Sequence, residues 1–100
     1  MKPKTIIEIV KRKRYNTDTA LLLAGDDFWD GHNWERQGRN TFLYRTKKGL
    51  YFTAHLSSAP GETDSIKPQT LDEAVSWYEK LPRRRVEFSD AFPGVEIEEA

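Results

Sequence analysis

Two strand-like segments, residues 41–46 and 50–56, are separated by Lys47, Lys48 and Gly49, and this arrangement constrains the fold most. Both segments are rich in aromatic and β-branched residues, which favour strands. Gly49 can adopt the positive φ that a tight connection requires. The sequence therefore predicts an antiparallel hairpin in the middle of the chain.

Two further strands are predicted in the first quarter of the chain. Residues 5–10 are mostly β-branched, and residues 11–14 form a polar exit from that strand. Residues 15–20 contain Asn, Thr and Asp side chains, which can bond to the nearby backbone and form a turn. Residues 21–24 are apolar and too short for an exposed helix, so we expect a buried strand there.

A helix is predicted to begin directly after Thr70. Thr70 and Glu73 have the spacing of a capping box, in which each side chain bonds the backbone amide of the other residue. The apolar residues from Leu71 onward recur at helical spacing on one face, and Pro82 ends the run. A second, short helical turn is expected at residues 89–92.

Together these segments predict an α+β fold, with an antiparallel sheet of three to five strands packed against one main C-terminal helix. Hydrophobic residues make up 37% of the chain and the net charge is zero, whereas disordered chains combine low hydrophobicity with high net charge. No internal repeat or linker is visible. Residues 1–100 are therefore expected to form a single domain, with residues 1–4 and 95–100 frayed.

The chain contains no cysteine, which excludes disulfides, thiol nucleophiles and cysteine-ligated metals. Its apolar runs are far shorter than the ~20 residues that cross a bilayer. The basic N-terminus is a poor signal peptide because Glu8 interrupts the apolar stretch that follows it. We therefore expect a cytoplasmic protein without membrane contact.

The zero net charge hides alternating blocks of charge. Residues 1–15 are basic, residues 18–30 are acidic, residues 35–48 are basic and the last fourteen residues are acidic. Two interpretations stay open. Opposite charges could pair across the strands of a β meander, or folding could gather one sign on one face and steer a charged partner.

Four residues form the densest candidate metal cluster, namely Asp26, Asp27, Asp30 and His32. Their oxygens and imidazole suit Mg²⁺ or Mn²⁺, but their spacing matches neither an EF-hand nor a two-histidine zinc motif. Neither histidine of the chain belongs to a G-x-S-x-G nucleophile motif. We expect the acidic cluster to solvate a turn, and we predict no metal, no cofactor and no enzymatic activity.

Residues 28–40 are predicted to form a long loop or distorted ribbon. Large aromatic side chains in such a polar, glycine-containing segment either cover an open side of the sheet or form an exposed anchor for a partner. Both interpretations stay open. The candidate partner-binding residues are Asp26, Asp27, Phe28, Trp29, Asp30 and Trp34.

Two basic clusters, residues 11–14 and 83–85, could instead contact phosphates. Tyr15, Tyr44 and Tyr51 would then offer stacking surfaces for a single strand. The overall neutrality argues against this alternative, because nucleic-acid-binding domains usually carry a basic excess. The candidate nucleic-acid contacts are Arg12, Arg14, Arg83, Arg84 and Arg85.

Three motifs resemble a group of small bacterial proteins that are common on mobile elements and in phage-derived regions. Those proteins typically start with Y-[ND]-T-[DE]-T-A, continue with L-Y-R-T-K-x-G-x-[FY]-F and end with a T-x-E-E-A-x-x-W helix. The matching segments here are residues 15–20, 43–52 and 70–77. The chain departs from the group at residues 54–58, where many relatives have a Gly-rich stretch.

The resemblance implies a non-enzymatic binding protein from a phage or mobile element that inhibits a host defence complex, as anti-CRISPR proteins do. Its mechanism would be steric and electrostatic blockade by acidic side chains together with Trp29 and Trp34. The expected partner is a host protein or ribonucleoprotein complex, and the expected state is a monomer or homodimer. A nucleic-acid-associated accessory protein is the alternative function.

Overall fold

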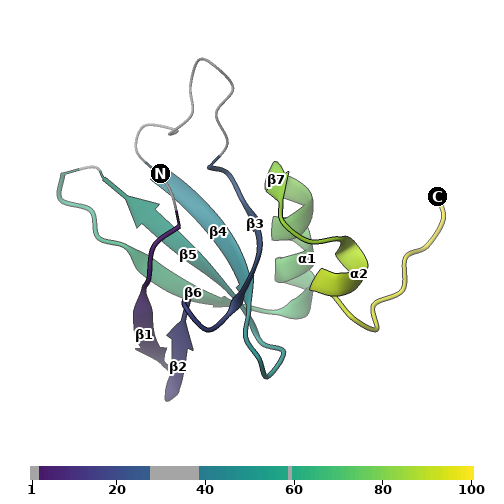
Figure 1. The fold of residues 1–100 in the computed structure, drawn as a ribbon, viewed down its shortest axis with the longest axis horizontal. Helices are drawn as coiled ribbons and strands as arrows, with labels where there is room; N and C mark the ends of the chain where they lie inside the picture. Colours follow the sequence, from purple (N-terminus) through teal and green to yellow (C-terminus); the bar gives the residue numbers. More distant parts are fainter. Residues whose placement is uncertain (1–2, 28–38, 59) are drawn as a thin grey trace.

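The computed structural model describes residues 3–27, 39–58 and 60–100. They form an α+β fold in which a five-stranded antiparallel sheet, ordered β6-β5-β4-β3-β7, packs against one main helix (Figure 1). A separate two-stranded sheet consists of β1 and β2. The predicted fold class is confirmed. The elements are β1 (Ile7–Val10), β2 (Lys13–Asn16), β3 (Leu21–Gly25), β4 (Arg39–Arg45), β5 (Tyr51–Ser57), β6 (Ser65–Gln69), α1 (Leu71–Lys80), β7 (Arg83–Arg84) and α2 (Phe88–Ala91).

The predicted central hairpin is present and pairs β4 with β5 over their full lengths, from Arg39 opposite Ser57 to Arg45 opposite Tyr51. Gly49 has a φ of 87°, and its amide donates to the Thr46 carbonyl at 2.9 Å. The positive φ lets the chain reverse within a few residues. Strands β3 and β6 then pair with the outer edges of this hairpin.

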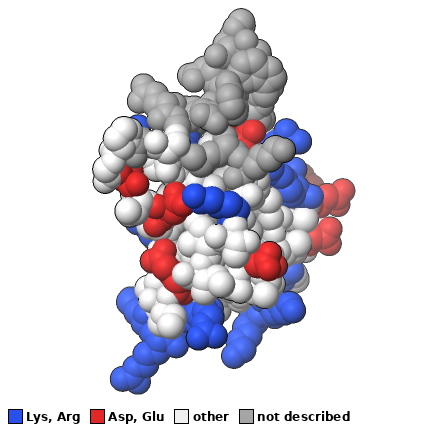
Figure 2. Space-filling model, turned by 60° about the vertical axis from the view of Figure 1, so that its left-hand side comes forward, with Lys and Arg blue, Asp and Glu red and all other residues white. Residues whose placement is uncertain are grey.

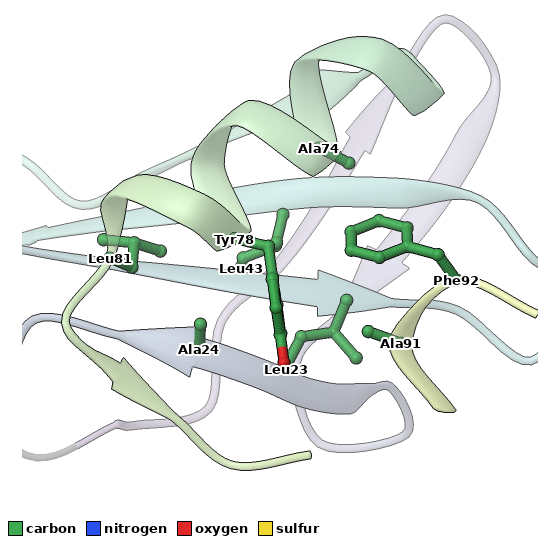
Figure 3. Close-up of a cluster of buried hydrophobic side chains, with 8 residues drawn as sticks. All are labelled: Leu23, Ala24, Leu43, Ala74, Tyr78, Leu81, Ala91 and Phe92. Atoms are coloured by element: carbon green, nitrogen blue, oxygen red, sulfur yellow. The ribbon is translucent and has the colours of Figure 1, made fainter. Parts of the chain in front are cut away.

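The sheet separates two hydrophobic clusters because successive side chains of each strand point to opposite faces. The cluster under the helices contains Leu23, Ala24, Leu43, Ala74, Tyr78, Leu81, Ala91 and Phe92 (Figure 3). The cluster on the other face contains Tyr15, Phe42, Tyr44, Phe52, Ala54, Leu56 and Ile66. Tyr15 belongs to β2, so the β1–β2 hairpin covers this second face.

The tyrosines that were candidate stacking surfaces contact other residues of the fold. Tyr15 and Tyr44 are only 5% and 4% exposed. Their rings pack on Phe52, with centroids 5.3 Å and 5.2 Å away. The Tyr51 hydroxyl donates to the Ala91 carbonyl at 3.0 Å. The expected stacking of a single strand on Tyr15 and Tyr44 is therefore corrected, because these side chains are almost fully buried, whereas stacking on Tyr51 stays a prediction.

Three short strands were not predicted. Lys11 and Arg12 have φ values of 51° and 69° and form a two-residue turn, so the expected polar exit folds back as β2. Strand β6 contains Pro68, which a central strand would not accept but an edge strand does. Strand β7 is two residues long and pairs with Ala24 and Gly25.

The predicted capping box is present at the start of α1. The Thr70 amide donates to Glu73 Oε1 at 2.8 Å, and the Glu73 amide donates to Thr70 Oγ1 at 3.2 Å. Ala74 and Tyr78 are buried as the helical spacing requires. Leu71 was expected on the same apolar face, but it is 45% exposed at the first turn. The predicted second helical turn is α2.

Candidate partner-binding site

The candidate partner-binding residues begin directly after β3. Asp26 and Asp27 follow Gly25, the last residue of that strand, and β4 begins at Arg39. Strands β3 and β4 are neighbours in the sheet and run antiparallel, so the residues that flank the intervening segment lie at the same end of the two strands. Phe28, Trp29, Asp30, His32 and Trp34 fall outside the described residues. Their assignment to a partner surface or to the core stays a prediction.

Asp26 ties these two ends together. Its Oδ1 atom accepts hydrogen bonds from the Thr41 amide at 2.8 Å and from Asn40 Nδ2 at 3.0 Å. Asn40 Nδ2 also donates to the Asp26 carbonyl at 3.1 Å, and the Asp26 amide donates to the Thr41 carbonyl at 3.3 Å. Asn40 is 2% exposed. We call this group of Asp26, Asn40 and Thr41 the Asp26 clamp.

Asp27 is fixed by a different partner. Its Oδ2 atom accepts from Arg85 Nη2 at 2.6 Å, and the two side chains are 9% and 25% exposed. The Arg85 amide donates to the Leu23 carbonyl at 2.9 Å, which holds the arginine beside β3. The other carboxylate oxygen, Oδ1, is buried without a hydrogen-bond partner in the part of the chain that the structure describes. The carboxylate of Asp27 is thus used within the fold.

An exposed ion pair connects the start of β4 to the turn after β5. Arg39 Nε lies 3.0 Å from Glu62 Oε1, and Arg39 Nη2 lies 2.6 Å from Glu62 Oε2. Hydrogen bonds from Arg39 and from the Ser57 hydroxyl lower the pKa of Glu62. The predicted turn over residues 57–63 is therefore attached to the same edge of the sheet as the Asp26 clamp.

His55 lies next to the Asp26 clamp, on the face of β5 that α1 covers. Its Nδ1 and Nε2 atoms lie 3.3 Å and 2.7 Å from the hydroxyls of Thr41 and Thr53. Its ring meets Trp77 of α1 edge to face, with centroids 5.9 Å apart. Burial, helped by the charge of Lys67, lowers the pKa of His55, and Asp26 opposes this shift. The imidazole is accordingly held neutral between two threonines.

The structure gives no support to a metal site in the described residues, where no group of three or more His, Asp or Glu side chains could hold an ion. Asp26 and Asp27, the described members of the candidate cluster, are bonded to Asn40, Thr41 and Arg85. Asp30 and His32 lie outside the described ranges. The expectation that the acidic residues solvate a turn stays a prediction for Asp30, while the carboxylate of Asp26 bonds to the start of β4.

The two candidate basic clusters lie at different places. Arg84 donates to the carbonyls of Tyr78 at 3.0 Å and Glu79 at 2.8 Å, and its guanidinium lies 5.2 Å from the centre of the Tyr78 ring. Arg85 is paired with Asp27, and only Arg83 of this trio has no side-chain partner in the described ranges. Arg12 and Arg14 belong to the β1–β2 hairpin instead.

Sequence reasoning identified Asp26 and Asp27 but missed Asn40 and Thr41, which bond to Asp26 and carry no local motif. It singled out Arg85 as a candidate phosphate contact, whereas the Arg85 guanidinium is paired with Asp27. The one signal is Asn40 itself, since asparagine is depleted in strands and a buried one needs specific partners.

Comparisons of the chain with protein family models, with curated proteins and with solved structures found no match. The resemblance to phage and mobile-element proteins therefore stays a prediction from the three motifs. Within the described residues, no helix combines the length and the apolar character that spanning a membrane would require.

Proposed function

We propose that this protein is a non-enzymatic binding protein, encoded by a phage or mobile element, that inhibits a host defence complex in the cytoplasm in the manner of anti-CRISPR proteins. The segment that begins at Asp26 and contains Phe28, Trp29, Asp30 and Trp34 supplies the contact surface. The Asp26 clamp is the observation that supports this proposal.

The Asp26 clamp fixes the position from which the segment is presented. Four hydrogen bonds join Asp26 to Asn40 and Thr41, and a largely buried ion pair holds Asp27. Binding loops are commonly mounted in this way on a rigid scaffold. A fixed base lowers the conformational entropy that a partner must remove when it binds.

The residue types of the segment suit adhesion. Tryptophan is enriched among the residues that dominate binding energy. Trp29 and Trp34 both lie in the sequence between Asp26 and Asn40, the residues that the Asp26 clamp joins. The carboxylate of Asp30 beside Trp29 favours a partner with a basic surface, such as the nucleic-acid channel of a ribonucleoprotein complex. The described polar groups at the base, Asp26, Asp27 and His55, are bonded within the fold, which favours a supporting role for them over turnover of a substrate.

The proposal is tested by affinity purification of the tagged protein from its natural host. The wild type is expected to retain a defence complex, and the double variant Trp29→Ala with Trp34→Ala is expected to lose it while keeping the thermal unfolding midpoint of the wild type. Glu98→Ala, an exposed change in the C-terminal segment, serves as the matched control and should retain the complex. Unfolding of the double variant would place the tryptophans in the core and remove the proposed surface.

A further inference from the structure

The turn between β1 and β2 and the turn between β4 and β5 lie together at the lower end of the molecule (Figure 1). The other end of β4, at Arg39, lies next to the Asp26 clamp. A groove of about 410 Å³ runs between the two turns. Its basic lining residues are Arg12, Lys13, Arg14, Lys47 and Lys48, and we call it the basic groove.

The charge of the basic groove is not compensated. Within the described ranges, no acidic side chain lines the groove and none of its five cations forms an ion pair. Figure 2 shows Lys and Arg side chains gathered at this end, with the acidic side chains of that face further up. Like charges held together repel one another and destabilise the fold. Such a cluster therefore suggests a bound anion.

The backbone of the β1–β2 turn gives a second, independent indication. Lys11 and Arg12 both have positive φ, a conformation that suits glycine or asparagine and strains other residues. Backbone strain of this kind is concentrated at functional sites. The hairpin tip thus carries two cations at positions where Asn and Gly would adopt the same backbone with less strain.

A neighbouring hollow extends the positive surface. It encloses about 350 Å³, shares Thr19, Thr46 and Lys47 with the basic groove and adds Arg45. The hydroxyl groups of Thr19 and Thr46 line this path together with the cations, and both residue types are donors to phosphate oxygens. The groove and the hollow are open, which fits a polymer lying across the surface better than an enclosed small molecule.

We propose that the basic groove binds the sugar–phosphate backbone of a nucleic acid duplex without reading its sequence. Tyr15 lines the groove but is 5% exposed, so no ring is offered for base stacking. Leu50, 39% exposed, is the one large aliphatic side chain among the described lining residues, whereas protein interfaces depend on a buried apolar centre. The groove therefore suits a duplex better than an acidic protein or a stacked single strand.

The basic groove lies at the other end of β4 from the Asp26 clamp and shares no residue with the contact surface proposed above. It retains Arg12 and Arg14 from the basic residues that the sequence suggested and adds Lys13, Lys47 and Lys48. Arg84 and Arg85 are left out because their guanidinium groups are bonded within the fold. Either proposal can fail while the other stands.

The test measures binding to a fluorescently labelled duplex DNA of about 20 base pairs by anisotropy, over salt concentrations from roughly 50 to 200 mM. A duplex RNA and a single-stranded DNA of the same sequence are measured in parallel, and poly-glutamate is the competing anion. The wild type is expected to bind both duplexes more tightly than the single strand. The logarithm of its affinity should fall linearly with the logarithm of salt.

Two variants remove charge from the basic groove without disturbing its turns. Lys47→Ala with Lys48→Ala should weaken duplex binding about tenfold and make the salt slope shallower by about 1.8, since each phosphate contact contributes about 0.9. Arg12→Asn removes one charge at a position whose left-handed backbone asparagine accepts, so it should weaken binding without unfolding the protein. Lys67→Ala with Arg83→Ala removes two exposed charges elsewhere and should leave the affinity unchanged.

Three results would overturn the proposal. The first is an absence of saturable duplex binding at the lowest salt. The second is an equal loss of affinity in the control variant with Lys67→Ala and Arg83→Ala, which would mean diffuse attraction without a site. The third is displacement of the duplex by poly-glutamate at equal charge concentration, which would assign the basic groove to an acidic protein.

Discussion

Arg85 donates a hydrogen bond to Asp27 at 2.6 Å across a separation of 58 residues, and this contact fastens the residues after β3 to the chain that follows β7. The Asp27 side chain is 9% exposed and that of Arg85 is 25% exposed. Removing one partner from a mostly buried pair leaves the other charge without compensation. Asp27→Ala should therefore lower the free energy of unfolding by about 2–3 kcal/mol, as measured by urea denaturation.

The ion pair of Arg39 with Glu62 provides the control for this prediction. Its side chains are 52% and 38% exposed, and water screens such pairs strongly. Glu62→Ala should leave the urea midpoint at the wild-type value. Equal losses in the two variants would show that burial does not distinguish the pairs.

Gly25→Ala is expected to destabilise the protein through a collision with a core ring. An added Cβ atom would lie 2.6 Å from Cδ1 and 2.9 Å from Cε1 of Phe42, whose side chain is fully buried and has no room to retreat. Overpacking of this kind costs roughly 1–3 kcal/mol. Thermal and urea unfolding of the variant measure the loss.

Gly49→Ala separates this steric effect from backbone strain. Nothing lies within 4 Å of a Cβ atom at Gly49, but its φ is positive. The expected loss is about 1 kcal/mol and comes from the backbone alone. Repacking of Phe42 should therefore be visible in near-ultraviolet circular dichroism for Gly25→Ala and absent for Gly49→Ala. Wild-type stability of the Gly25→Ala protein would contradict the close approach of Phe42 to Gly25.

His55 is expected to make the stability depend on pH. Burial holds its pKa in the folded protein below the ordinary value of 6.5, so the unfolded chain takes up a proton first as the pH falls. Stability is then fully present above pH 6.5 and decreases as the pH falls through this value. The decrease ends below the lowered pKa.

The comparison of wild type with His55→Gln isolates this effect. Urea denaturation at about pH 7.5 and pH 5.5 should show a loss of stability for the wild type that is smaller for the variant. Carboxylates such as Asp64, whose pKa is lowered chiefly by its hydrogen bond with Lys4, titrate at lower pH and contribute equally to both proteins. Identical pH dependence in the two proteins would show that His55 is not desolvated.

The elements that could be predicted from the sequence are those with a complete local signal. Thr70 and Glu73 form their capping box within one helical turn, and Gly49 supplies the turn of the central hairpin. Strand β6 has one buried residue, Ile66, and a proline, so its pairing with β5 depends on an edge that only the assembled sheet offers. Propensity carries no information about such an edge.

The candidate sites show the same division. The sequence singled out Asp26 and Arg12 because each lies in a block of one charge. It did not indicate that Asp26 would bond to Asn40 and Thr41, or that Lys47 would line a groove with Arg12. Both relationships depend on how two hairpins are placed, which follows from packing on the sheet and not from spacing along the chain.

The left-handed turn at Lys11 and Arg12 makes thermal stability and nucleic-acid binding favour different residues at these two positions. Asn followed by Gly would relax this backbone, and the strain relieved is about 1 kcal/mol at each position. A library sorted for survival of heating should drift toward those uncharged residues. A library sorted for retention on immobilised duplex should keep the cation at Arg12, so the ratio of the two enrichments measures how stability and duplex binding oppose each other at the hairpin tip.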